Sequence, residues 1–159
     1  MSPAAEWAVK RLRRSVTALK KRCAEGTAAV DEYRRLVAVG APPEGDALER
    51  LNTAITRLYP AEREAAAALN GAIPHLREVA DLDRFDACMG NYKATAAELQ
   101  TFSQRMNQRI MQFQARIPYQ SESDSARQLA QLAQDLFEGV GQRVAMLNEC
   151  LEFGIVLAD

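Results

Sequence analysis

Apolar side chains recur three and four residues apart along most of the chain, which is the pattern of amphipathic helices. In the first segment this spacing holds for four heptads, from Val9 to Val37, with one weak position at Gly26. The pattern predicts a single helix over residues 4–39, about 50 Å long at about 1.5 Å per residue. Gly40 and the prolines just after it are typical of a helix end, because glycine closes the last turn and proline cannot continue it.

The second segment carries the same spacing from Leu48 to Val79, and Asp46 is a suitable N-cap residue before it. Two prolines, Pro60 and Pro74, interrupt this segment. Proline removes a hydrogen bond to the residue four positions before it, and it is also favoured at the first position of a new helix. We therefore expect either one helix that is kinked at the prolines, or two or three shorter helices.

The third and fourth segments show the pattern with different regularity. Residues 82–117 keep the heptad spacing for five repeats and end at Pro118. A polar loop follows, and apolar residues then recur from Leu129 to Ile155 at an average spacing of about 3.6, which fits a straight amphipathic helix. The alternation that is typical of strands does not occur in the sequence.

These segments predict an all-α fold, an elongated antiparallel bundle of about four long helices with coiled-coil-like heptad packing. The length of 159 residues fits a single domain over residues 1–159. An alternative is that two or more segments extend as a coiled coil and complete their core with another chain. Because the chain ends four residues after the core-type Ile155, it can also be a domain cut from a longer protein.

The composition offers little for catalysis or metal binding. Hydrophobic residues make up 48% and charged residues 26% of the chain, as in ordinary globular proteins, and the single histidine is His75. Metal sites in helical bundles use Glu-x-x-His on two helices, whereas this chain has His75-x-x-Glu78 once. Phosphate-binding, dinucleotide-binding and zinc-protease motifs are absent from the sequence. We therefore expect no enzyme, no cofactor and no metal site.

The cysteines and the chain start indicate an intracellular, most simply cytoplasmic, protein. Cys23, Cys88 and Cys150 lie more than sixty residues apart and form no CxxC pair, which favours reduced core cysteines. The first residues lack the apolar region of a secretory signal. The longest apolar run, near the C-terminus, is much shorter than the roughly 20 residues of a transmembrane helix.

The net charge of −1 hides a gradient along the chain. Residues 1–22 carry seven basic residues and one acid, Glu6, whereas residues 117–159 carry seven acids and two arginines. The basic segment is a candidate electrostatic patch for anionic lipid or for nucleic-acid phosphate. A solvated helix face, or a face paired with the acidic segments, is the purely structural alternative. The candidate patch comprises Lys10, Arg11, Arg13, Arg14, Lys20, Lys21 and Arg22.

Two further surfaces are candidates for contact with a partner. Glutamines recur every four residues along the third segment with arginines beside them, a pattern that suits a polar flank against a partner helix. This flank comprises Gln100, Gln104, Arg105, Gln108, Arg109 and Gln112. Apolar residues at the two chain ends either close the bundle or form an exposed apolar end patch that docks a partner. This end patch comprises Trp7, Leu151, Phe153, Ile155, Val156 and Leu157.

Together these features predict a non-enzymatic interaction or scaffold module that works by helix–helix packing. Its partner would be another helical protein or a second copy of the chain, with flank charges setting the choice. The alternative function is peripheral binding of anionic membrane or nucleic acid through the basic N-terminal helix. A third option is a helical secretion or assembly chaperone that holds its client at the apolar ends. We expect no small-molecule substrate.

Overall fold

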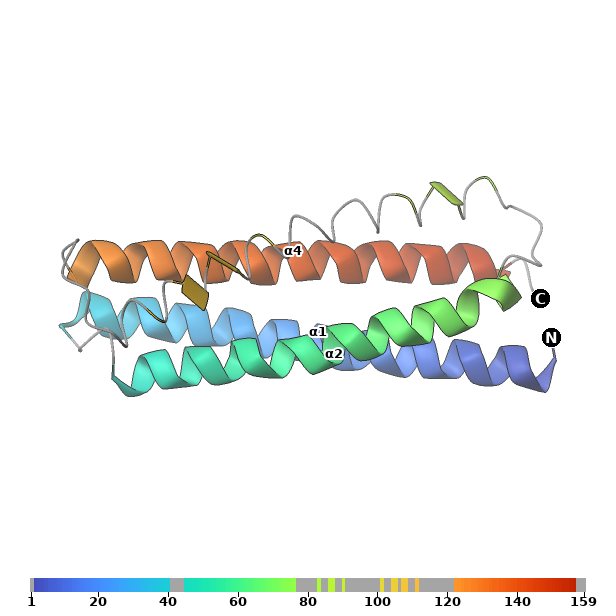
Figure 1. The fold of residues 1–159 in the computed structure, drawn as a ribbon, viewed down its shortest axis with the longest axis horizontal. Helices are drawn as coiled ribbons and strands as arrows, with labels where there is room; N and C mark the ends of the chain where they lie inside the picture. The colour runs from blue at the N-terminus through green and yellow to red at the C-terminus, as the bar shows by residue number, and fades with distance from the viewer. Residues whose placement is uncertain are drawn as a thin grey trace.

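Three long helices that pack against one another make up most of the described part of the chain. The computed structural model describes residues 2–40, 45–76 and 122–156, together with residues 83, 86, 87, 90, 101, 104, 105, 107, 108 and 111. The helices are α1 (Pro3–Ala38), α2 (Asp46–Leu76) and α4 (Glu122–Val156) (Figure 1). No strand occurs among these residues, so the all-α prediction is confirmed for this part of the chain.

The helices lie side by side in an elongated bundle, and α1 is the element that the other two share (Figure 1). α1 packs along both α2 and α4, whereas α2 and α4 meet each other at few places. α1 runs antiparallel to both neighbours, so its first turn lies at the same end of the bundle as the last turn of α4 (Figure 1). Two ion pairs agree with the antiparallel arrangement of α1 and α2. Arg11, early in α1, pairs with Glu64, late in α2, and Glu32, late in α1, pairs with Arg50, early in α2.

α1 begins and ends close to the residues that the sequence indicates. Ser2 Oγ accepts a hydrogen bond from the backbone N–H of Ala5 at 3.2 Å and so caps the first turn. At the other end the backbone N–H groups of Val39 and Gly40 donate to carbonyls of the last turn. Gly40 adopts a left-handed φ of 93°, which glycine tolerates without steric cost, and the helix ends just before it.

α2 is one continuous helix, although the sequence also allowed a break at its prolines. It begins at Asp46, and helical backbone continues through both Pro60 and Pro74. The alternative of two or three separate helices is therefore wrong, and the helix curves along its length in Figure 1. Pro60 has no N–H to donate to the carbonyl of Thr56, so the helix tolerates a missing hydrogen bond there. Packing against α1 compensates, because Leu58 and Ala65 on either side of Pro60 are fully buried.

The apolar stripe of α1 is buried inside the chain. Leu12 and Leu19 are fully covered, and Tyr33 near the other end of α1 is buried as well. Gly26, the weak position of the stripe, is also buried because the ring of Phe137 on α4 lies against it. Burial of apolar surface of this kind is the main favourable term in helix packing. Among the described residues, the largest fully buried side chains are Tyr33, Phe137, Leu12, Leu19, Leu51, Ile55, Leu58, Leu129, Leu136, Leu147 and Val30.

The predicted third helix, over residues 82–117, falls mostly outside the described residues. Those positions between 83 and 111 that are described have helical backbone and are exposed. The count of about four helices and the coiled-coil form of the packing therefore stay predictions.

Candidate interaction surface

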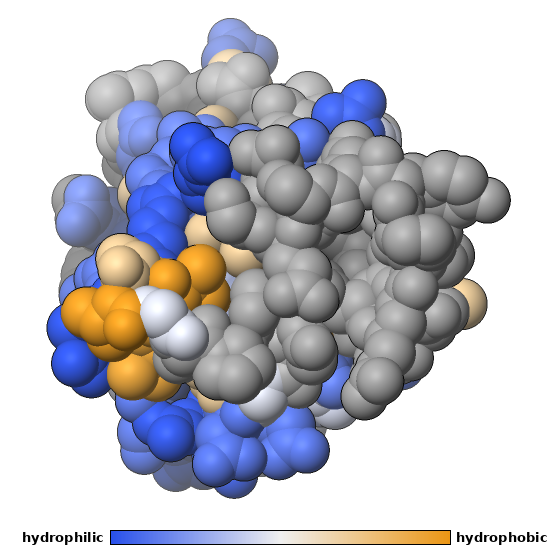
Figure 2. Space-filling model, turned by 90° about the vertical axis from the view of Figure 1, so that its left-hand side faces the viewer, coloured by the Kyte–Doolittle hydropathy of each residue, from blue (hydrophilic) through white to orange (hydrophobic). Residues whose placement is uncertain are grey.

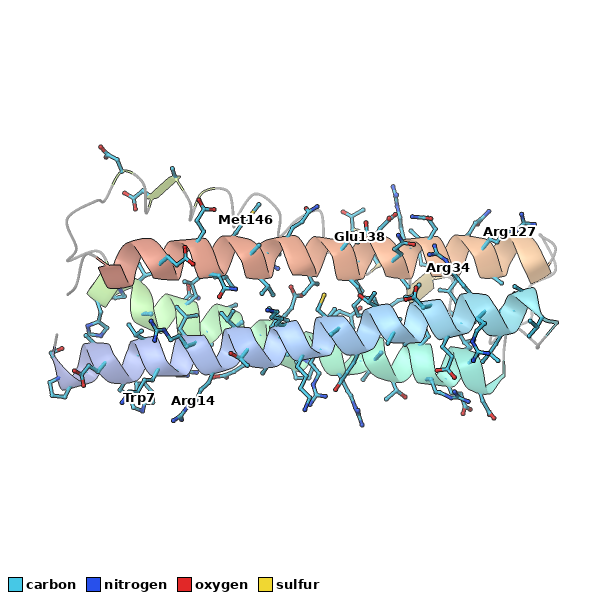
Figure 3. The ribbon with its side chains drawn as sticks, turned by 180° about the vertical axis from the view of Figure 1, so that it is seen from behind. Trp7, Arg14, Arg34, Arg127, Glu138 and Met146 are labelled. Atoms are coloured by element: carbon cyan, nitrogen blue, oxygen red, sulfur yellow. The ribbon has the colours of Figure 1, made fainter. Side chains whose placement is uncertain are left out.

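The solvent-facing side of α1 carries a line of exposed cations in its first half. Lys10, Arg13, Arg14, Lys20 and Lys21 are all exposed, and we call these five residues the basic face. Their intervals of three, four and seven residues place them on one side of the helix. The opposite side of α1 is the buried apolar stripe, so the basic face points away from the core. In Figure 3 the labelled Arg14 projects from α1 on the side away from α4.

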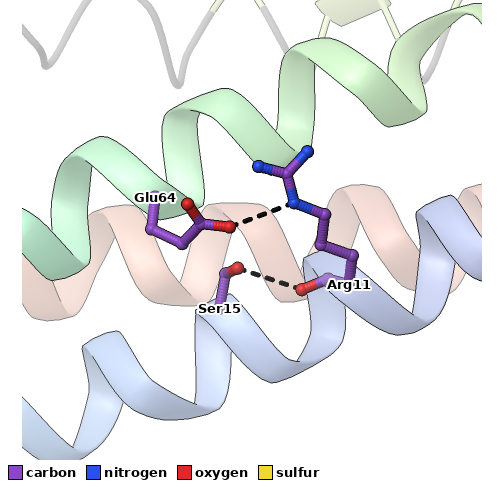
Figure 4. Close-up of polar contacts among 3 residues, drawn as sticks. All are labelled: Arg11, Ser15 and Glu64. Atoms are coloured by element: carbon purple, nitrogen blue, oxygen red, sulfur yellow. Dashed lines mark hydrogen bonds and ion pairs between the residues drawn. The ribbon is translucent and has the colours of Figure 1, made fainter.

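The other two cations of the predicted cluster are held in ion pairs beside the basic face. Arg11 Nε donates to Glu64 Oε1 of α2 at 3.0 Å (Figure 4). Arg22 donates from Nη1 to both carboxylate oxygens of Glu25, at 3.1 and 2.9 Å. The hydrogen bonds from Arg22 are the main reason that the pKa of Glu25 is lowered. The predicted cluster therefore divides into five outward cations and two that are paired.

The basic face itself has no acidic partner within the described part of the chain. No carboxylate there lies within 4 Å of any of its five cations, and no described hydrogen bond involves their side chains. The remaining exposed residues of α1 between Trp7 and Glu25 are neutral: Thr17, Ala18 and Ala24. The result is a strip of positive charge along α1, with the exposed Glu6 at its start and the ion-paired Glu25 at its end.

Trp7 stands at the start of the basic face and is 65% exposed. It precedes Arg14 and Lys21 by seven and fourteen residues, so the three lie on one line along α1. The guanidinium of Arg11 lies 5.8 Å from the centre of the Trp7 ring, within the range of a cation–π contact. Because Arg11 is also bound to Glu64, this contact holds the indole in place at the surface.

The base of this arrangement is well packed. Ser15, the buried polar residue of α1, donates from Oγ to the backbone carbonyl of Arg11 at 3.0 Å, so its hydroxyl is satisfied (Figure 4). On α2, Gly71 lies under the Arg11 guanidinium, since a Cβ there would come to 3.9 Å from Nη1. The position of Arg11, and with it that of Trp7, is thus set by two helices.

The predicted apolar end patch is only partly within the described residues. Trp7 is exposed on α1, where it accompanies the cations. Leu151, Phe153, Ile155 and Val156 lie in α4, but their side chains, and all of Leu157, are outside the described residues. Trp7 was predicted in the apolar end patch, although its seven-residue spacing to Arg14 indicates a place beside the basic face.

The predicted glutamine flank is also described in part. Gln104, Arg105 and Gln108 have helical backbone and are exposed. Gln100, Arg109 and Gln112 lie outside the described residues. The three that are described are open to solvent, as a flank for a partner would be.

Glu62 and Arg143 form an ion pair between α2 and α4, which sequence analysis did not identify. Arg143 Nη1 donates to Glu62 Oε1 at 2.8 Å. Only 11% of the Arg143 side chain and 21% of the Glu62 side chain are exposed. Burial raises the pKa of Glu62, and the charge and hydrogen bond of Arg143 oppose that effect. The signal in the sequence was a glutamate at an apolar position of the second segment. The pair connects two helices that otherwise meet at few places.

The described residues offer little chemistry elsewhere. Among them no three His, Cys, Asp or Glu side chains gather into a metal-binding group. Cys23 is half-buried and donates from Sγ to the backbone carbonyl of Phe137 at 3.0 Å, and burial raises the pKa of its thiol. None of the described helices contains an apolar stretch long and uncharged enough to cross a bilayer.

The opposite end of the bundle carries a small apolar surface. Val39, just after α1, is 75% exposed, and Leu36 and Val37 beside it are half-buried. Figure 2, which views this end, shows apolar side chains gathered among hydrophilic ones. This surface and the basic face lie in opposite halves of α1.

The chain matches no protein-family model, and comparisons with curated proteins and with solved structures found no similar protein.

Proposed function

We propose that this chain is a non-enzymatic binding module that contacts an anionic partner through the basic face of α1. The observation that carries the proposal is the set of five exposed cations that form no ion pair in the described part of the chain. Cations aligned in this way raise the local concentration of an anionic partner and speed its association. The near-zero net charge does not prevent this, because the potential is local and decays over about 10 Å at 0.1 M salt.

Burial of the apolar stripe of α1 supports a charged contact over a helix–helix contact through that stripe. Val9, Leu12, Val16 and Leu19 are buried within a single chain. A partner helix could reach this stripe only by displacing α2 or α4. The predicted helix over residues 82–117 and coiled-coil packing are still part of the proposed architecture. Both would contribute contacts to the core of the single chain.

Retention on a sulfonate cation-exchange matrix at neutral pH and low salt tests this proposal. The protein should be retained despite its net charge of −1 and should elute as salt is raised. The face variant Lys10→Glu/Arg14→Glu/Lys21→Glu should pass through the matrix. A control variant of equal net charge, Arg35→Glu/Arg105→Glu/Arg127→Glu, should elute after the face variant.

Two results of that experiment would overturn the proposal. One is passage of the unmodified protein through the matrix at low salt. The other is elution of the face variant and the control variant at the same salt concentration, because binding would then depend on net charge and not on the basic face. Circular dichroism of both variants checks that each retains its helical content.

Association between copies is a second candidate function, and the apolar surface at Val39 favours it. A valine that is 75% exposed beside half-buried Leu36 and Val37 is suited to contact with another apolar surface. Light scattering after size exclusion would then show a mass above 17.6 kDa that rises with concentration and falls in Val39→Asp. A constant monomer mass would exclude this candidate and leave the basic face as the binding surface.

A further inference from the structure

We infer that the basic face and Trp7 together dock this chain on the anionic surface of a lipid bilayer. The inference rests on the proposed function and names the class of partner that the basic face binds. It follows from the line that these residues form, from the exposure of the indole and from the neutral side chains between the cations.

The line of residues matches a flat surface. Trp7, Arg14 and Lys21 follow one another at intervals of seven residues, and Lys10 and Lys20 lie beside them. Fourteen residues of α-helix span about 21 Å. Because α2 and α4 pack against the other side of α1, the helix can lie with this face on a plane without a clash from its neighbours.

Trp7 has the chemistry of a residue at a bilayer interface. Its ring is amphipathic, and tryptophan is favoured at the level of lipid headgroups, where one part of the ring is apolar and the N–H is hydrated. The ring is 65% exposed, and its contact with Arg11 keeps it beside the cations. A bilayer offers both anionic headgroups for the lysines and arginines and an apolar layer for the indole.

Nucleic acid fits the same face less well. Proteins that bind single strands place aromatic side chains between their cations so that bases can stack on them, and none lies between Lys10 and Lys21. The neutral residues there, Thr17 and Ala18, have short side chains. A duplex supplies phosphates for the cations but no apolar layer for Trp7.

The expected strength of binding follows from the number of cations. Each lysine or arginine near an anionic leaflet improves binding about fivefold at low ionic strength. Loss of three of the five should therefore weaken binding at least about a hundredfold. Salt should weaken binding of the unmodified protein, because the contacts are exposed.

Fluorescence of Trp7, the single tryptophan of the chain, reports docking directly. The protein is titrated with vesicles of phosphatidylcholine alone and with vesicles that contain phosphatidylserine. A blue shift and saturable binding should occur with phosphatidylserine and be absent with phosphatidylcholine alone. The face variant should lose binding about a hundredfold or more. The control variant at Arg35, Arg105 and Arg127 should bind better than the face variant.

The contribution of the indole is tested separately by co-sedimentation with the phosphatidylserine vesicles, which needs no tryptophan. Trp7→Ser should bind several-fold more weakly than the unmodified protein. Met111→Ser, which removes an apolar side chain that is 66% exposed, should bind as the unmodified protein does. Equal affinity of Trp7→Ser and the unmodified protein for the vesicles would overturn the role of Trp7 in docking.

The outcomes separate the bilayer from the broader proposal. Retention on the sulfonate matrix without binding to phosphatidylserine vesicles would overturn the bilayer inference and leave the proposed function standing. Tighter binding to duplex DNA than to vesicles at equal phosphate concentration would overturn it in the same way. Failure to bind the matrix, the vesicles and DNA would overturn both.

Discussion

The ring of Phe137 lies against the backbone of Gly26, so close that a Cβ at residue 26 would fall 2.0 Å from Phe137 Cε1. Only 1% of Phe137 is exposed. One turn away on α1, the Cys23 thiol donates to the backbone carbonyl of the same phenylalanine. These contacts fix the register of α1 on α4, because a bulky side chain fits there only opposite a glycine.

Gly26→Ala is expected to destabilise the protein by about 2 kcal/mol, since the added methyl group overlaps the Phe137 ring. This sign is opposite to that of helix propensity, which favours alanine over glycine by about 1 kcal/mol. Urea unfolding followed by circular dichroism measures the free energy of unfolding of both proteins.

Gly141→Ala, in the same interface, is the matched control for that substitution. A Cβ at residue 141 would lie 3.8 Å from Cys23 Sγ, an ordinary van der Waals distance. Here helix propensity should dominate and raise stability by up to about 1 kcal/mol. If Gly26→Ala and Gly141→Ala have the same free energy of unfolding, the close approach of Phe137 to Gly26 is wrong.

Pro60→Ala is expected to raise the free energy of unfolding by about 1–3 kcal/mol. Pro60 is exposed in the interior of α2, so alanine restores a backbone hydrogen bond to Thr56 without loss of packing. Pro3→Ala is the comparison, because proline in the first turn of α1 removes no helical hydrogen bond and its replacement should change stability little. Destabilisation by Pro60→Ala would contradict a continuous α2.

Glu62 should make stability depend on pH. Burial raises its pKa in the folded chain, so just above the ordinary glutamate pKa of about 4.3 the folded state holds more protons than the unfolded state. The contribution of Glu62 is therefore greatest below that pH and declines as pH rises through the folded pKa. The difference in unfolding free energy between the protein and Glu62→Gln should fall from pH 4 upward. A difference that grows with pH would show that attraction by Arg143 outweighs burial.

Much of the fold follows from local signals in the sequence. The ends of α1 at Ser2 and Gly40 depend on capping and backbone preference, which act over a few residues. Asp46, expected as the N-cap of the second segment, is instead the first residue of α2. The buried stripe of α1 follows from spacing alone, since Val9 to Tyr33 repeat as one face of a helix.

The contacts between helices could not be predicted from the sequence in the same way. Phe137 stands outside the regular series of the fourth segment, and its place opposite Gly26 depends on the register of two helices more than a hundred residues apart. Glu62 was visible as a charge at an apolar position, but the sequence does not say which arginine pairs with it. The same holds for Arg11, which the sequence groups with the basic cluster and the structure places on Glu64.

The proposed surface was visible in the sequence as a cluster of charge but not as a face. Heptad positions distribute the seven cations around α1, and only the pairing of Arg11 and Arg22 shows which five remain outward. The Arg11 guanidinium, which contacts the Trp7 ring, is also bound to Glu64 of α2. The Arg22–Glu25 pair lies within α1, but the pairing of Arg11 with Glu64 joins two helices and is not visible in one segment.

Collisional quenching of Trp7 tests most directly whether an exposed, electropositive face surrounds it. At low ionic strength the anion iodide should quench Trp7 more strongly than the cation caesium, and salt should reduce the difference. The preference should be smaller in the face variant Lys10→Glu/Arg14→Glu/Lys21→Glu and kept in the control variant at Arg35, Arg105 and Arg127. An equal preference for iodide in the unmodified protein and in the face variant at low salt would contradict the basic face.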